Sequence, residues 1–200
     1  MALSALGLLA AYLIGAIPVG FLVARVAGGT DIRRAGSGNI GATNVLRTLG
    51  TGPAVLTLLG DIVKGYVAVR AAGSIGPEAW AAAGGAVAAI AGNCWPVFLA
   101  FRGGKGVATG LGAFLALIPW AVGPAAVLWL AVTALSRYIS MASMIACVSL
   151  PVGALLLGYP WPTVVAAALA ALIIVWRHRE NIARLASGTE RRLGERARAA

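Results

Sequence analysis

The chain is poor in charged residues, and in acidic residues above all. Only 11% of its 200 residues are charged, with 6 Asp or Glu against 16 Lys or Arg. A soluble domain usually contains about 25% charged residues, so these few cannot cover the surface of a soluble protein of this length. Hydrophobic residues make up 60% of the chain, and the mean hydropathy is +0.89. We therefore expect an all-α integral membrane protein, because a helix in lipid satisfies its own backbone hydrogen bonds.

Cysteine and histidine are also scarce. The two cysteines, Cys94 and Cys147, lack the paired spacing of a metal site, and His178 is the only histidine. This composition excludes a zinc or haem cluster of the usual kind. We expect no metal and no other cofactor, and interpret both thiols as packing residues.

The formal net charge is +10. Such a charge indicates a nucleic-acid partner when the basic residues form one face with interleaved aromatic residues. Here they lie instead at the ends of apolar runs. No nucleic-acid role is expected. The positive-inside rule, which places Lys and Arg in cytoplasmic loops, explains the charge better.

Apolar segments fill most of the chain, and a spanning helix needs about 20 such residues. The N-terminal segment lacks a basic start and a cleavage site, so we interpret it as a retained helix rather than a signal peptide. No separate soluble domain and no internal repeat is visible, which predicts a single transmembrane domain over 1–200 with a basic cytoplasmic tail over 176–200. The expected helices are 3–24, 53–72, 79–98, 107–119, 120–136, 141–158 and 161–176.

Charge bias also predicts the topology. The loop segments 33–47 and 102–106 and the tail are basic, so all three are expected in the cytoplasm. An even number of crossings must then separate Lys105 from the tail, which requires region 107–136 to divide near Pro119. About seven transmembrane helices follow, with the N-terminus outside and the C-terminus cytoplasmic. Pro77-Glu78 and Tyr159-Pro160 become short external turns.

Three polar segments carry candidate chemistry, and the first spans residues 36–47. It contains G-x-G-x-x-G, but a dinucleotide fold needs a preceding strand, and here a membrane helix precedes it. Small residues such as Gly36 and Gly38 let backbone N–H groups converge on an anion. The alternative is a solvated loop of turn residues. Polar side chains follow at Ser37, Asn39, Thr43, Asn44 and Arg47.

The second segment contains Gly103-Gly104-Lys105-Gly106. It is not a Walker A loop, because Leu99 stands where the first glycine belongs and Gly106 replaces the magnesium-binding Ser or Thr. It does place a lysine on a flexible backbone at a helix N-terminus, where free N–H groups attract anions. The alternative is a lysine that merely flanks the membrane.

The third segment begins at His178, one helical turn before Asn181, so the two side chains share a face. A polar flank that ends the last helix is the alternative. Ser140 and Ser143 begin the sixth expected helix. Inside the second, Asp61 and Lys64 stand at i and i+3, where mutual neutralisation is the simplest interpretation.

These segments together resemble the three cytoplasmic motifs of the bacterial membrane glycerol-3-phosphate acyltransferase family that uses acyl phosphate. The matching residues are Gly-Ser-Gly-Asn-Ile-Gly-Ala-Thr-Asn (36–44) with Arg47, Phe-Arg-Gly-Gly-Lys-Gly-Val-Ala-Thr (101–109) and His-Arg-Glu-Asn-Ile (178–182). Length, helix count and motif order agree as well. The chain departs from the family at Gly92-Asn93, where Gly-His is usual.

The resemblance implies a reaction in which acyl phosphate and glycerol 3-phosphate give lysophosphatidate and phosphate, the first acylation of phospholipid biosynthesis. It implies a multi-pass protein of the bacterial inner membrane, with membrane lipid around it, a cytoplasmic active site and the soluble enzyme that makes acyl phosphate as a possible partner. Expected catalytic residues are Ser37, Arg47, Lys105, His178 and Asn181. Expected substrate-binding residues are Gly36, Gly38, Asn39, Thr43, Asn44, Gly103, Gly104, Gly106 and Ser143.

Other acyltransferase chemistry is not supported. His-x4-Asp enzymes need Asp where this chain has Ala183, and no Ser-His-Asp set is present to form a covalent acyl-enzyme. His178 is the only conventional base, and we expect it to position substrate while a substrate phosphate accepts the proton. The alternative functions are an anion or small-metabolite transporter, which would favour inverted repeats, and a non-catalytic membrane subunit.

Overall fold

The structure is a computed structural model that describes residues 2–76 and 78–195, and within them every regular element is a helix. This confirms the all-α prediction. The expected turn residue Pro77 and the tail residues Arg196 and Arg198 lie outside the described residues. The elements are α1 (Ala2–Ala16), α2 (Val19–Gly28), η1 (Ile32–Arg34), α3 (Ala42–Leu49), α4 (Thr51–Ile75), α5 (Ala79–Cys94), η2 (Val97–Leu99), α6 (Val107–Leu117), α7 (Pro119–Ser136), α8 (Ile139–Leu156), α9 (Trp161–Arg177) and α10 (Arg179–Ala186).

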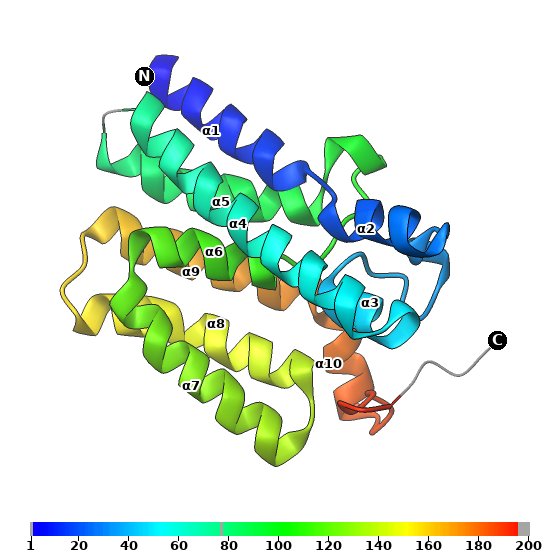
Figure 1. Cartoon of the computed structure of the whole chain (residues 1–200). Helices are drawn as coiled ribbons and strands as arrows, with labels where there is room; N and C mark the ends of the chain where they lie inside the picture. Colours follow the sequence, from blue (N-terminus) through cyan, green and yellow to red (C-terminus); the bar gives the residue numbers. More distant parts are fainter. Residues whose placement is uncertain (1, 77, 196–200) are drawn as a thin grey trace.

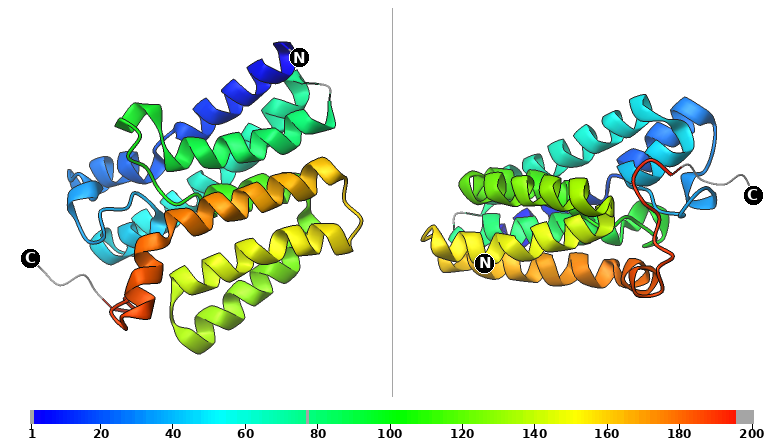
Figure 2. Two further views of the ribbon diagram at one scale, coloured as in Figure 1. Left: turned by 180° about the vertical axis from the view of Figure 1, so that it is seen from behind. Right: turned by 90° about the horizontal axis from the view of Figure 1, so that it is seen from below.

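The long helices form one bundle (Figure 1). Helix α1 packs on α4 and α5 at one side, and α7 packs on α8 at the other. Between these groups, α6 packs against α4 and α5, while α9 joins α5 to α8. The short helices α2, α3 and α10 gather at one end of the bundle, and the views in Figure 2 agree on this. The first and third expected motifs therefore converge at one end, and Lys105 of the second motif reaches Asn181 of α10 there.

Several segments are long and apolar enough to cross a membrane, which confirms a multi-pass membrane protein. Among the described residues there are 5 such spans, or 6 if α9 and α10, bent by 57°, count as one. Helix α6 has only 11 residues. The five spans are Ala2–Gly28, Thr51–Ile75, Ala79–Leu99, Pro119–Ser136 and Ile139–Leu156.

Proline and motif sequences explain where the helices differ from expectation. The first expected helix is interrupted before Pro18, which cannot donate a helical hydrogen bond, and α2 follows. The third ends at Cys94, two residues before Pro96. The expected division of 107–136 is present at Ile118. The expected loop at 33–47 is wrong in its second half, because residues 42–49 form α3.

Glycine lets α4 and α6 approach backbone to backbone. A Cβ built on Gly112 would lie 1.8 Å from the carbonyl oxygen of Ile62, and one on Gly65 would lie 2.0 Å from that of Thr109. No side chain fits at either point, so this contact depends on small residues, as is common in membrane bundles.

We expect Gly112→Ala to destabilise the protein by about 1–3 kcal/mol, the usual cost of overpacking. The matched control is Gly123→Ala in α7, where the added methyl group would meet no atom within 4 Å. The measurement is the thermal unfolding midpoint of both variants in detergent. Equal midpoints for the two variants would show that α4 and α6 do not pack as described.

Candidate active site

A cavity of about 650 Å³ opens among the helices at the end where the motifs converge. Its wall combines residues of α3, α4 and α5, among them Asn93, with residues of α6 to α10. Most of the expected site residues line it, although they come from four distant parts of the sequence. These are Gly36, Ser37, Asn39, Thr43, Asn44, Arg47, Lys105, Gly106, Ser143, His178 and Asn181, whereas Gly38, Gly103 and Gly104 are not part of the wall.

Asn44 organises the first motif. Its side chain is buried, and its Oδ1 accepts a hydrogen bond from the backbone N–H of Ser37 at 2.8 Å. Its Nδ2 donates to the carbonyl oxygens of Ile32, Ala35 and Asn39 at 3.3, 3.0 and 2.8 Å. The amide of Asn44 is thus occupied within the loop, and it holds Ser37 at the cavity wall.

Arg47 follows on α3, one turn after Asn44. Burial, together with the nearby positive charge of Arg191, lowers the pKa of its guanidinium. Its Nη2 donates to the carbonyl oxygen of Arg191 at 3.4 Å. Because the guanidinium of arginine is not deprotonated in proteins, Arg47 remains a cation at the cavity wall and presents a planar fork suited to phosphate.

The second motif turns sharply to place Lys105 in the cavity. Gly106 adopts a left-handed conformation, with φ of 81°, immediately before α6. Lys105 donates a hydrogen bond to Asn181 Oδ1. Burial, and then repulsion from Arg184, lowers the pKa of Lys105 to about 8. Lys105 is therefore a partly desolvated cation, and such a group attracts an anion more strongly than a solvated lysine does.

Gly103 and Gly104 support that turn from behind. Arg177 of α9 donates through Nε to the Gly104 carbonyl oxygen at 3.0 Å and through Nη2 to that of Gly103 at 3.2 Å. Both glycines were expected to bind substrate. In the structure they lie outside the cavity wall, and their backbones contact protein atoms.

His178 lies at the bend between α9 and α10, where it is 3% exposed. Its Nδ1 lies 2.7 Å from the carbonyl oxygen of Ile174. A carbonyl only accepts, so Nδ1 carries the proton and Nε2 keeps a free lone pair. Burial, and then the charge of Lys105, lowers the pKa of His178 to about 4. At neutral pH the ring is uncharged and weakly basic.

Asn181 and Glu190 join the third motif to the chain beyond α10. Asn181 Nδ2 donates to Glu190 Oε1 at 2.6 Å, and Ser140 Oγ donates to the same oxygen at 2.7 Å. Arg184 Nε donates to Glu190 Oε2 at 2.7 Å. Burial opposes ionisation, but these three hydrogen bonds outweigh it and lower the pKa of Glu190.

Glu190, Arg184 and Arg191 lie outside the expected site residues, although all three line the cavity. One signal was available, because Glu190 is one of only 6 acidic residues in the chain and stands directly before two arginines. A single carboxylate among several cations is attracted to them electrostatically, which favours a fixed position.

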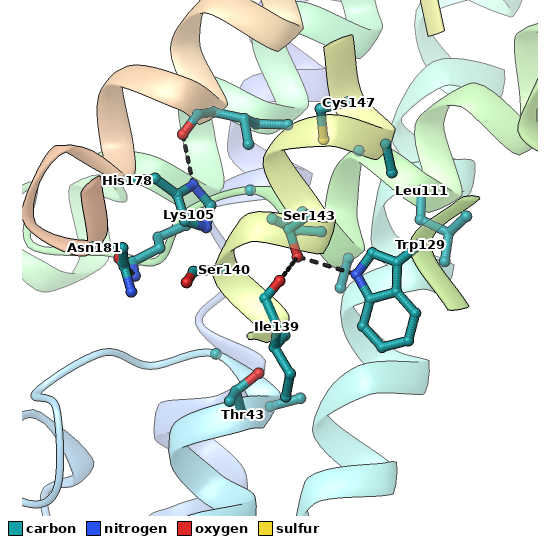
Figure 3. A pocket seen from close by; sticks show the side chains of 18 of the residues that line it. Thr43, Lys105, Leu111, Trp129, Ile139, Ser140, Ser143, Cys147, His178 and Asn181 are labelled. Atoms are coloured by element: carbon teal, nitrogen blue, oxygen red, sulfur yellow. Dashed lines mark hydrogen bonds between the residues drawn. The ribbon is translucent and has the colours of Figure 1, made fainter. Parts of the chain in front are cut away.

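The other part of the cavity is apolar. Figure 3 shows Lys105, His178 and Asn181 grouped on one side, with Leu111, Trp129 and Cys147 on the other. Ser143 lies between them, donating to the carbonyl oxygen of Ile139 at 2.8 Å and accepting from Trp129 Nε1 at 3.1 Å. Further apolar wall residues are Phe114, Val122, Leu130, Leu150, Ala167 and Ile174.

This arrangement suits an amphipathic anion. The cavity presents the cations Arg47 and Lys105 beside neutral hydrogen-bonding groups, and it continues into an apolar chamber within the bundle. In the part of the chain that the structure describes, no group of 3 or more His, Cys, Asp or Glu could hold a metal ion.

Comparisons with known proteins agree on one family. A family model described as "Glycerol-3-phosphate acyltransferase" matches residues 5–188. A glycerol-3-phosphate acyltransferase of Thermus thermophilus is 52% identical over 197 residues, 96% of each chain. One of Rubrobacter xylanophilus is 47% identical over 194 residues, 97% of each chain.

Solved structures give the same result. The chain is similar to the crystal structure of PlsY (YgiH), an integral membrane glycerol 3-phosphate acyltransferase, in its glycerol 3-phosphate form. The TM-score is 0.90 at 38% identity, with 96% of each chain covered. The lysophosphatidic acid form of that protein gives a TM-score of 0.87 at 37% identity, covering 96% of this chain and 95% of that one.

Proposed function

The chain belongs to the glycerol-3-phosphate acyltransferase family, and from this premise we propose that it takes its acyl group from acyl phosphate. It is an acyltransferase of phospholipid synthesis that acylates glycerol 3-phosphate. In the proposed reaction the 1-hydroxyl is acylated, and the products are lysophosphatidate and phosphate. The observation that most directly supports this proposal is a single cavity that joins a cationic, hydrogen-bonding end to an apolar chamber. That combination fits two phosphate groups and one acyl chain.

The proposed roles follow from the contacts. Lys105 and Arg47 bind the two phosphate groups, because they are the cations that the motifs bring into the wall. The hydroxyl of Ser37 adds a neutral donor, assisted by Thr43 and the Gly36 and Gly106 turns. Asn39 and Asn44 shape the first motif, Gly38 gives it a left-handed turn, and Gly103 and Gly104 support Lys105. Asn181 orients Lys105, and Ser143 borders the acyl chamber.

The reaction needs little covalent help from the protein. The glycerol oxygen attacks the acyl carbonyl carbon, the bond between that carbon and the phosphate oxygen breaks, and phosphate leaves with the electron pair. A phosphate oxygen accepts the hydroxyl proton. Holding both anions together and stabilising the developing negative charge are the main tasks, and Lys105 and Arg47 are suited to both.

We expect His178→Ala to raise the KM for glycerol 3-phosphate by roughly 3–10-fold, the value of one neutral hydrogen bond, with a smaller effect on kcat. Because its pKa is about 4, His178 is neutral at pH 5 and above. The dependence of kcat on pH between pH 5 and 7 should therefore have the same shape in the variant as in the wild type. Steady-state kinetics of both proteins measure this. A loss of roughly 10²–10⁴ in kcat with unchanged binding would instead indicate a general base.

The topology belongs to the same proposal. We place seven crossings in the membrane, with α1 and α2 as one crossing, α6 as a short one, the N-terminus outside and the C-terminus in the cytoplasm. Basic residues at 33–47, at 102–106 and beyond 176 support a cytoplasmic active site in the bacterial inner membrane. The whole chain would be one catalytic domain, supplied with acyl phosphate by a soluble enzyme.

A transport assay separates this function from the anion transporter alternative. Sealed proteoliposomes are given labelled glycerol 3-phosphate with or without acyl phosphate. We expect the label to enter the lipid fraction only when acyl phosphate is present. Accumulation of unmodified label inside the vesicles, without a lipid product, would favour the transporter.

A further inference from the structure

A buried ion pair within α4 has no part in the mechanism above. Lys64 Nζ lies 2.7 Å from Asp61 Oδ1, and the two side chains are 5% and 7% exposed. Buried charges are costly unless they are paired and hydrogen-bonded. Asp61 is also part of the wall of the catalytic cavity, so this pair borders the site.

Lys64 extends this pair to another helix. Its Nζ donates to Asn93 Oδ1 on α5 at 2.9 Å and to the carbonyl oxygen of Ile17 at 2.7 Å. The ammonium therefore has three oxygen partners from three separate segments, two of them hydrogen-bond acceptors and the third the ion-pair partner Asp61. Asn93, which is 5% exposed, is held in one orientation by a charged donor.

Asn93 in turn touches the loop that carries Lys105. Its carbonyl oxygen accepts from the Gly104 N–H at 2.9 Å. A Cβ on Gly103 would lie 2.2 Å from that carbonyl oxygen, and one on Gly104 would lie 2.8 Å from Asn93 Nδ2. The glycines of the second motif are thus needed because Asn93 lies directly against them.

We propose that Asp61, Lys64 and Asn93 are positioning residues that hold the Gly103-Gly104 turn and thereby aim Lys105 into the catalytic cavity. The ion pair fixes Lys64, Lys64 fixes Asn93, and Asn93 fixes the backbone next to Lys105. Arg177 holds the same two glycines through their carbonyl oxygens. The turn is therefore held by two residues: Asn93 accepts from the Gly104 N–H, and Arg177 donates to the carbonyl oxygens of Gly103 and Gly104.

This inference rests on the proposed role of Lys105, and two readouts test it. Asn93→Leu removes the acceptor for Lys64 at similar volume. We expect kcat/KM to fall at least tenfold, and amide hydrogen exchange to rise at residues 102–106 but not along α5 or α9. The double variant Asp61→Asn/Lys64→Met, which leaves no unpaired charge, should behave in the same way.

Two variants complete the experiment. Asn93→His keeps a ring nitrogen that can accept from Lys64, and we expect it to retain activity within threefold of the wild type. Thr57→Val, also buried in α4 but bonded only to the carbonyl oxygen of Pro53, controls for loss of a buried polar group and should change neither readout.

Three results would overturn the inference: kcat/KM of Asn93→Leu within threefold of the wild type, exchange that rises equally throughout α5 and α9, or an Asn93→His variant as impaired as Asn93→Leu. Failure of the proposed function is distinct, because wild-type protein would then form no product while exchange at residues 102–106 still responded to Asn93→Leu.

Discussion

Replacing Lys105 with methionine is expected to lower kcat/KM by roughly 10²–10³, the usual effect of removing one donor that stabilises developing negative charge. Lys105 is a half-buried cation of the cavity wall, and it is oriented by Asn181. Methionine keeps most of the volume and removes the charge. The loss should therefore appear in catalysis rather than in stability, and parallel steady-state kinetics and thermal unfolding measure the two.

The pH profile gives this prediction a second readout. A lysine is charged below its pKa, and burial lowers that of Lys105 to about 8. The kcat/KM, which reports groups of the free enzyme, should therefore fall about tenfold per pH unit above pH 8. Lys105→Arg keeps its charge throughout this range and should lose the alkaline decline. An unchanged decline in Lys105→Arg would mean that another group controls it.

Replacing Asn44 with leucine is expected to reduce kcat/KM by roughly 10² or more. The amide of Asn44 bonds one N–H and three carbonyl groups of the first motif. Each buried partner left unsatisfied costs about 1–3 kcal/mol, so the loop would leave its present conformation. A displacement of about 1 Å is enough for a hundredfold loss in rate.

Asn44→Asp is the matched comparison, because it keeps the acceptor for the Ser37 N–H and removes the donors to the three carbonyls. The carboxylate oxygen that replaces Nδ2 would face those three carbonyl oxygens and be repelled by them, so we expect a loss at least as large as that of Asn44→Leu. Both variants should keep their helical circular dichroism, since the loop lies outside the long helices. Full activity in Asn44→Leu would contradict the role given to this side chain.

Much of this architecture could be predicted because composition and apolar runs dominate in a membrane. Spans such as α4 and α8 need only their own hydrophobic length, and the division near Pro119 follows from charge parity and proline. The conversion of residues 42–49 into α3 could not be predicted, because this short polar helix depends on Asn44 and on packing against α4.

The site was predictable where the motif was local. Lys105, His178 and Asn181 stood out by their residue types, and the structure brings them to one cavity. Glu190 and Asn93 were not predictable as partners, because their contacts join residues distant in the sequence. Glu190 reaches back to Ser140, and Asn93 reaches Lys64 through the interior. Such long-range contacts leave no periodic signal in a single chain.

The most direct test of the central claim is a comparison of donors. Purified protein in lipid is given glycerol 3-phosphate with either acyl phosphate or acyl-CoA, and lysophosphatidate and free phosphate are measured together. We predict equal amounts of both products from acyl phosphate and no lysophosphatidate from acyl-CoA. The function proposed for this cavity would be contradicted if lysophosphatidate formed only from acyl-CoA, or if neither donor gave any lysophosphatidate.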